Sequence, residues 1–354
     1  MQRVLLLYGG RSSEHAISCL SARSVLEVVD RDRYEVIAVG ITRAGRWTLT
    51  EGVIATSAEQ PLPQVDDAGA TVALVGTRSG PQLLAIDEDT GTAHGLGGVD
   101  VAFPLLHGPF GEDGTVQGLF ATVGLPYVGA DVTASSIGID KGAMKAAFAA
   151  QGLPQLPYRC ITRAVWQHDR AGITAMLESE LDAPWFVKPA RQGSSIGISR
   201  VEAAEDLEEA MQLAFGYDEV AVIEQAADRP RELEVGVLGS SEPQVAGPGE
   251  VVPSHEFYDF EAKYLDASEL RIPADVPEEL AERLRHLARE AYRAIGCRGL
   301  GRVDFLLGAD GQVVVNEINT IPGFTPASMF PRLWAAAGLD YPALVDRLLD
   351  DAAP

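Results

Sequence analysis

The chain has 354 residues, of which 46% are apolar, enough for two to three domains with substantial cores. Its formal net charge of −23 argues against a nucleic acid or an anionic membrane as a partner, although the same acidity would suit a salt-rich habitat. No run approaches the roughly 20 apolar residues of a membrane span. Cys19, Cys160 and Cys297 are far apart and form no CxxC pair, which indicates a reducing cytoplasm.

The first 129 residues alternate strand and helix patterns. Apolar runs at 4–8, 34–41 and 99–106 predict strands, helical patterns cover 16–29 and 115–123, and 51–98 is weakly patterned. This order predicts a parallel sheet with ligand-binding loops at the carboxyl ends of its strands. Gly9 and Gly10 do not form the GxGxxG fingerprint of a dinucleotide site. Glu14 and His107 lie in such loops, although each alone would more often cap a helix than bind a ligand.

Residues 130–228 form a second predicted unit. A helix opens at Asp140 and Lys141, and a strand at 185–189 carries Lys188 just before the loop ARQGSSIG. A glycine- and serine-rich loop after a strand lysine can cover phosphates with its backbone N–H groups. The loop lacks the Walker pattern, so an ordinary surface loop is the alternative.

Residues 229–354 form the third predicted unit. It contains a strand at 232–238, an amphipathic helix at 277–294 and a final helix pair at 331–337 and 342–352. The long polar segment EFYDFEAKY at 256–264 is expected to be a mobile lid over a binding site.

A hairpin in this unit carries the strongest chemical signal. Asp310-Gly311 between two apolar runs predicts a two-residue turn, which places Asp304 opposite Glu317 and Arg302 opposite Asn319 on one face. Facing carboxylates repel unless a cation lies between them, and these oxygen ligands suit Mg²⁺ or Mn²⁺. A solvated polar face is the alternative, and a bulge or a longer loop would change the register.

The basic residues are mostly arginine. Only four of the 28 are lysines, at positions 141, 145, 188 and 263. A compact ammonium can act as a point charge on a phosphate, which a planar guanidinium does not imitate. The alternative is compositional drift, which is the more plausible explanation for Lys145 than for the other three.

These motifs, taken together and in this order, resemble the D-alanine–D-alanine ligases of the ATP-grasp superfamily. The similar segments are GGRSSEHAIS, LHGPFGEDGTVQGL, GIDKGAMK, FVKPARQGSSIGIS, IEQ with RELEVGVLG, YDFEAKY, GCRGLGRVDF and NEINTIPGFTPASM. The resemblance implies an α/β chain in which a doubly wound parallel-sheet domain, the pre-ATP-grasp domain at 1–129, precedes a two-lobed α+β ATP-grasp fold. The lobes would cover 130–228 and 229–354, the second with the metal site.

The resemblance also implies residue roles. The implied ATP contacts are Lys141, Lys188 and Lys263 on the phosphates, Glu224, Gln225 and Ala227 on adenine, Glu232 on the ribose, and Ser195 and Asn316. The implied ligands of two Mg²⁺ or Mn²⁺ ions are Asp304, Glu317 and Asn319. The implied D-alanine contacts are Glu14 and His107 for the first substrate and Ser328 and Met329 for the second. Arg302 and the N–H of Gly323 would hold the developing oxyanion, and Glu14, Ser194 and Tyr264 would tie the lids together. Residues 226–231 are one residue longer than the usual spacing of the family.

The implied reaction consumes ATP to phosphorylate the carboxylate of one D-alanine, which the amine of a second D-alanine then attacks. D-alanyl-D-alanine, ADP and phosphate result, for peptidoglycan precursors, and a cytoplasmic homodimer is expected by resemblance alone. A D-alanine–D-lactate or D-alanine–D-serine ligase is the nearest competing function, against which Tyr264 argues. More distant candidates are an ATP-grasp ligase of different substrates, such as a carboxylase, and a non-catalytic ATP-binding regulator. Glu14 and Ser328 argue against the first, and the intact Lys188 and Arg302 against the second.

Overall fold

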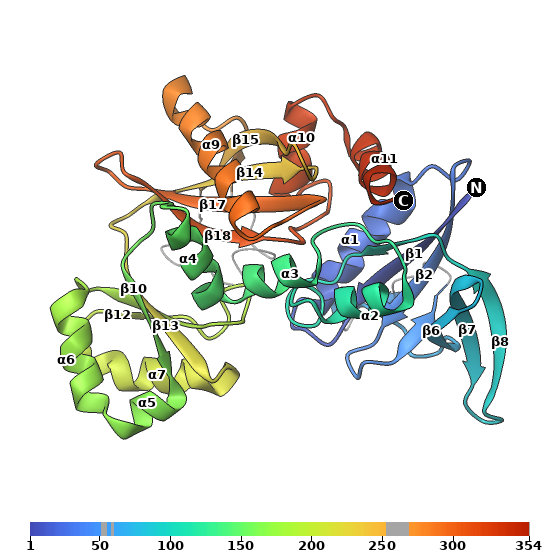
Figure 1. The fold of residues 1–354 in the computed structure, drawn as a ribbon, viewed down its shortest axis with the longest axis horizontal. Coiled ribbons are helices and arrows are strands. Elements are labelled where there is room, and N and C mark those ends of the chain that lie inside the picture. Colours follow the sequence, from blue (N-terminus) through green and yellow to red (C-terminus); the bar gives the residue numbers. More distant parts are fainter. Residues whose placement is uncertain (51–54, 58–59, 253–268, 354) are drawn as a thin grey trace.

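The computed structural model of the protein describes residues 1–50, 55–57, 60–252 and 269–353. The predicted lid at 256–264, with Lys263 and Tyr264, lies outside the described residues. Three main sheets follow one another along the chain, and Figure 1 shows the first at one end of the molecule and the second at the other. No helix in the described part of the chain is long and apolar enough to cross a membrane.

One end of the N-terminal sheet is parallel, as the sequence predicts. Strand β1 (Gln2–Gly9) pairs in parallel with β2 (Tyr34–Ile41) on one side and with β9 (Val101–Pro104) on the other. Antiparallel strands lie beyond β2 and make the whole sheet mixed. They are β3 (Trp47–Leu49) and, from the weakly patterned segment, β6 (Thr71–Thr77), β7 (Gly80–Asp87) and β8 (Thr92–Gly98). A separate two-stranded sheet pairs β4 (Ala55–Ser57) with β5 (Gln60–Gln64).

The position of β1 between β2 and β9 agrees with its apolar sequence. Side chains alternate between the faces of a strand, and both faces of β1 are covered. Leu6 and Tyr8 pack into one buried cluster, whereas Leu5 and Leu7 pack into another on the opposite face. Helix α1 (His15–Val28) covers the first face, and α2 (Thr115–Val123) lies on the second. The loops after β1 and β9 are therefore held at one end of the sheet.

The second sheet is antiparallel and four-stranded. Its order is β10 (Tyr158–Thr162), β13 (Val220–Gln225), β11 (Trp185–Pro189) and β12 (Ser199–Val201). Its own apolar cluster includes side chains of α5 (Arg163–His168), α6 (Arg170–Glu180) and α7 (Leu207–Tyr217), which follows the 3-10 turn η1 (Ala204–Asp206). Helices α3 (Val132–Ile139) and α4 (Lys141–Ala150) lead into this unit from the N-terminal sheet (Figure 1).

The third sheet is antiparallel and five-stranded. Its order is β16 (Glu269–Arg271), β15 (Gln244–Val252), β14 (Arg231–Leu238), β17 (Leu300–Leu307) and β18 (Val313–Asn319). Helix α9 (Glu278–Ala294) packs on it within one apolar cluster. Helices α10 (Met329–Ala336) and α11 (Tyr341–Ala352) belong to a cluster that continues into the N-terminal sheet, so these two sheets share a core. The predicted division at residues 129 and 228 stays a prediction.

The predicted two-residue turn of the hairpin is wrong, although the predicted pairing is confirmed. Near the turn Leu307 pairs with Val313, and the Gly308 N–H donates to the Gln312 carbonyl at 2.9 Å, so residues 309–311 form a three-residue loop. Three-residue loops commonly end on a left-handed residue, here Gly311 with φ of 79°. A bulge at position 316 then adds one residue to β18. The two shifts cancel, so Asp304 faces Glu317 and Arg302 faces Asn319.

Candidate active site

Segments from all three sheets meet at Glu14. This residue precedes α1, is buried, and accepts a hydrogen bond at 2.5 Å from the Ser194 hydroxyl, which belongs to the loop after β11. His107, in the loop after β9, has its Nδ1 3.0 Å from the carbonyl of Ile321, which follows β18. The structure thus brings together Glu14, Ser194 and His107, which are far apart in the sequence.

A second carboxylate, which is half-buried, lies at this meeting point, and the sequence reasoning missed it. Glu112 accepts backbone hydrogen bonds from Gly108 at 2.7 Å and from Ile321 at 3.0 Å. Burial, with the nearby charge of Glu14 adding to it, raises the pKa of Glu112 to about 8. Burial also lowers the pKa of His107, despite the opposing charge of Glu14. The only signal for Glu112 was its place in the quoted segment LHGPFGEDGTVQGL.

Arg302 lies at the centre of a buried charged cluster on β14, β17 and β18. Its guanidinium contacts both oxygens of Asp304 at 2.7 Å, and its Nε lies 2.9 Å from a carboxylate oxygen of Glu234. The Asn319 amide donates to Asp304 at 2.9 Å, and Glu317 faces Asp304 across the hairpin. Burial opposes the charged form of Arg302, but the charges of Asp304 and Glu234 raise its pKa well above the ordinary value.

The donor set of this cluster fits a hard divalent cation. The three carboxylates of Glu234, Asp304 and Glu317 around one guanidinium leave a formal excess of two negative charges. All the available ligand atoms are carboxylate or amide oxygens, as Mg²⁺ and Mn²⁺ prefer. Among the described residues no group of three His, Cys, Asp or Glu side chains is arranged to hold a metal ion. With Asp304 and Glu317 as two ligands, the third would therefore be the amide oxygen of Asn319.

Two lysines gather around Glu224 on the middle strands of the second sheet, and a third lies nearby at the start of α4. Lys188 on β11 lies 2.5 Å from a carboxylate oxygen of Glu224 on β13, and Lys145 on α4 forms an ion pair with the other oxygen. Lys141 at the start of α4 donates to the carbonyl of Gln192 at 2.6 Å, in the loop after β11. Lys145, which compositional drift could have explained, is 1% exposed and central to this cluster. Its sequence signal was its spacing from Lys141 on one helix.

The remaining predicted ATP contacts lie on or next to the second and third sheets. Ser195 follows Ser194 in the loop after β11, where both residues have positive φ. Gln225 ends β13 and accepts a hydrogen bond from the Asp182 N–H at 3.3 Å. The connection that contains Ala227 turns at Arg229, whose φ is 41°. The one-residue insertion predicted at 226–231 falls in this connection and stays a prediction. Two further predicted contacts lie on the third sheet: Glu232 near the start of β14 and Asn316 at the bulge of β18.

The predicted second-substrate contacts lie in the segment that joins β18 to α10. The Ser328 hydroxyl bonds to the N–H and the hydroxyl of Thr325, at 3.2 and 2.9 Å. A Cβ atom on Gly323 would lie 3.1 Å from that hydroxyl, so the two residues are in close contact. Met329 begins α10 and is buried. Ile321 in the same segment contacts His107, so this segment borders the predicted first-substrate residues.

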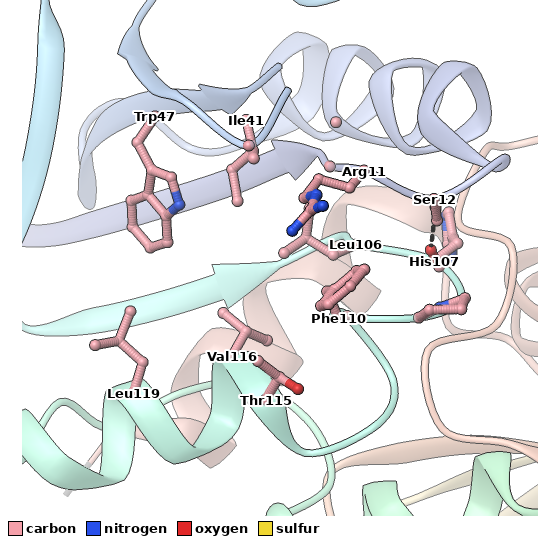
Figure 2. A pocket seen from close by; sticks show the side chains of 15 residues that line it. Arg11, Ser12, Ile41, Trp47, Leu106, His107, Phe110, Thr115, Val116 and Leu119 are labelled. Carbon is pink, nitrogen blue, oxygen red and sulfur yellow. Dashed lines mark hydrogen bonds between the residues drawn. The ribbon is translucent and has the colours of Figure 1, made fainter. Parts of the chain in front are cut away.

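A cavity of about 240 Å³ is lined in part by the loops after β1 and β9. Figure 2 shows Leu106, Val116 and Trp47 among its apolar walls, with the Arg11 guanidinium over the Phe110 ring. The dashed line in the figure is the bond that the Ser12 hydroxyl donates to the His107 carbonyl, at 2.7 Å. The cavity therefore shares its wall with the loop that carries His107.

The fold and these clusters define an ATP-grasp ligase, with a mixed α/β domain before two antiparallel lobes that carry lysines and oxygen ligands. The family model described as D-ala D-ala ligase N-terminus matches residues 3–130, and that described as D-ala D-ala ligase C-terminus matches residues 147–350. The chain therefore belongs to the D-alanine–D-alanine ligase family, and it is a ligase.

Curated relatives match over the full length. The D-alanine–D-alanine ligase of an Arthrobacter species is 46% identical over 357 residues, which cover 98% of this chain and 93% of the relative. That of Mycolicibacterium smegmatis is 49% identical over 369 residues, covering 99% and 95%. The solved VanG D-Ala:D-Ser ligase from Enterococcus faecalis is 31% identical with a TM-score of 0.84, covering 99% of both chains.

Proposed function

We propose that this chain joins two D-alanines into D-alanyl-D-alanine for peptidoglycan synthesis, at the expense of ATP. The first carboxylate becomes an acyl phosphate, the amine of the second D-alanine attacks it, and ADP and phosphate leave. The observation that carries the proposal is the full-length similarity to curated D-alanine–D-alanine ligases. Both steps move negative charge between oxygens, so the protein contributes mainly positioning and electrostatic stabilisation.

We assign the nucleotide to the space between the second and third sheets. Lys141, Lys188 and Lys263 hold the phosphates, supported by the gathering of the first two beside the loop after β11. The other contacts are Glu224, Gln225 and Ala227 with adenine, Glu232 with the ribose, and Ser195 and Asn316. Asp304, Glu317 and Asn319 hold two ions of Mg²⁺ or Mn²⁺, in keeping with the excess negative charge around Arg302. When bound, these ions supply neutralisation of phosphate charge.

We assign the first D-alanine to the meeting point of the three sheets. Glu14 binds its ammonium and His107 lies beside it, both buried where water is excluded. Arg302 and the Gly323 N–H hold the oxyanion that develops on the oxygen of the attacked carbonyl group. Both are hydrogen-bond donors at the end of the third sheet. Ser194 and Tyr264 join Glu14 in closing the site. Ser328 and Met329 bind the carboxylate of the second substrate.

The acceptor is the point at which a second candidate function remains. The solved structure of the D-Ala:D-Ser ligase matches this chain over its whole length, which keeps D-serine as an alternative acceptor. D-lactate is a further candidate, and the neutral Tyr264 in the lid favours an amine acceptor over it, because a cationic residue there would repel an ammonium.

The experiment that tests the function supplies D-alanine, D-serine and D-lactate at equal concentrations with ATP and Mg²⁺, and separates the products. We expect mainly D-alanyl-D-alanine at neutral pH. Mainly D-alanyl-D-serine or D-alanyl-D-lactate would overturn the acceptor and leave the ligase standing. Phosphate release that D-alanine does not stimulate would favour the non-catalytic regulator. Light scattering on the purified protein tests the homodimer that we propose for the cytoplasmic enzyme.

A further inference from the structure

One buried carboxylate forms ion pairs with two lysines in this structure. Glu224 on β13 is 2% exposed, and each of its oxygens contacts a different ammonium. One contact is with Lys145 on α4, and the other is with Lys188 on β11 at 2.5 Å. Burial would raise the pKa of Glu224, but the charges of Lys188 and Lys145 outweigh it and lower that pKa.

The two lysines differ in how they are held. The side chain of Lys145 is 2% exposed, enclosed between α4 and the second sheet, with its ammonium 5.2 Å from the centre of the Tyr158 ring. The side chain of Lys188 is 14% exposed, and its strand ends one residue later, at the loop that contains Ser194. Lys145 is therefore a fixed counterion of Glu224, whereas Lys188 lies at the border of the site.

A second anion competes for Lys188. In the proposed function Lys188 contacts the phosphates of ATP, and this contact draws its ammonium from Glu224. A buried carboxylate that loses its only counterion is strongly destabilised. Glu224 avoids this cost because Lys145 stays in place.

We infer that Lys145 is a positioning residue that keeps Glu224 neutralised while Lys188 passes between that carboxylate and the phosphates of ATP. The inference rests on the proposed phosphate contact of Lys188. Without the nucleotide, both lysines share Glu224. With it, Lys145 alone balances the carboxylate, so the transfer of Lys188 costs little. Lys145 thereby acts on ATP affinity without touching the nucleotide.

A purely structural ion pair predicts a different outcome. Such a pair would hold α4 against β13, and its loss would lower stability without a specific effect on nucleotide binding. The two roles differ most clearly when Glu224 is neutralised as well. If Lys145 serves only as its counterion, Glu224→Gln removes the need for Lys145, and ATP no longer competes with a carboxylate for Lys188.

The experiment compares Lys145→Met, Glu224→Gln, the double variant of both, and the control Met144→Ala, which removes a buried side chain of the same helix without changing charge. Calorimetry gives the dissociation constant of MgADP, and steady-state assays separate KM for ATP from kcat. For Lys145→Met we expect the dissociation constant of MgADP and the KM for ATP to rise about tenfold each, because Glu224 then retains Lys188. Glu224→Gln alone records any loss of the proposed adenine contact, so the double variant should bind within about threefold of Glu224→Gln, and the Met144→Ala control should bind as the wild type does.

Two results would overturn the inference. One is wild-type MgADP affinity in Lys145→Met, and the other is a double variant that loses as much affinity relative to Glu224→Gln as Lys145→Met loses relative to the wild type. If Lys145→Met does not fold, Lys145→Arg decides instead. It keeps the charge, so KM for ATP should stay within about threefold of the wild type, and a folded Lys145→Arg with a much larger KM would contradict a counterion role. Failure of the proposed function is distinct, because the wild type itself would then bind no MgADP.

Discussion

Glu112 is expected to make the stability of this protein fall as the pH rises. Its half-buried carboxylate lies near Glu14 and accepts hydrogen bonds from two backbone N–H groups. Burial raises its pKa from 4.5 to about 8. Between these two pH values the folded state holds a proton that the unfolded state has released. The stability that this proton confers is complete below about pH 4.5 and is lost as the pH rises through about 8.

The size of the effect follows from the shift. The free energy of unfolding should fall by up to about 1.4 kcal/mol per pH unit in this window. From pH 5 to pH 7 the contribution of Glu112 to the free energy of unfolding falls by roughly 2 to 3 kcal/mol. Glu112→Gln removes the titration and keeps the size of the side chain. Its amide loses one of the two acceptor contacts, but that cost does not depend on pH and leaves the slope unchanged.

Urea unfolding of the wild type and of Glu112→Gln across pH 5 to 8.5 measures this slope. We expect the stability of Glu112→Gln relative to the wild type to rise with pH. Infrared difference spectra at pH 7 provide a check that does not assume two-state unfolding, because the wild type should show a protonated carboxyl band that Glu112→Gln lacks. A stability difference that is constant with pH, together with no such band, would refute the reasoning.

The other predictions concern the charges and the acceptor. Asp304→Asn removes one carboxylate from around Arg302, and turnover should fall about a hundredfold or more with an unchanged circular dichroism spectrum; near-normal magnesium-dependent turnover would contradict the metal assignment. Lys188→Arg replaces a compact ammonium with a planar fork, so KM for ATP should rise about tenfold or more, and kinetics equal to the wild type would argue against the point-charge role. Tyr264→His should raise the share of D-alanyl-D-lactate as the pH falls, since the imidazole then becomes charged; product ratios that do not change with pH would count against it.

The sequence alone was sufficient for the features that depend on local periodicity. The continuous apolar run at 4–8 predicted a strand, and β1 is the middle one of three parallel strands, with Leu5 and Leu6 in different clusters. Most predicted elements after residue 98 match the structure closely, including α2, β11 and the two strands of the hairpin. The weakly patterned segment 51–98 gave no such signal, because strands β6 to β8 at the edge of the sheet are only partly buried and rich in glycine.

The hairpin shows how local reasoning can reach the right pairing through a wrong turn. Asp310-Gly311 indicated a hairpin, but the number of residues in its loop and the bulge at 316 depend on how β18 packs in the third sheet. Because side chains alternate along a strand, one shift alone would have moved Glu317 to the other face. The second shift restored it, and nothing in the local sequence required that.

Tertiary structure alone decided which charged groups share a buried site. Lys145 stands on a helix with an ordinary pattern, and its importance comes from Glu224, which lies 79 residues away on another element. The pKa of Glu112 is likewise set by its burial near Glu14, and these two residues are far apart in the sequence. Periodicity reports which face of an element is buried, whereas the cost of burying a charge depends on the partner that packing places within a few ångströms of it.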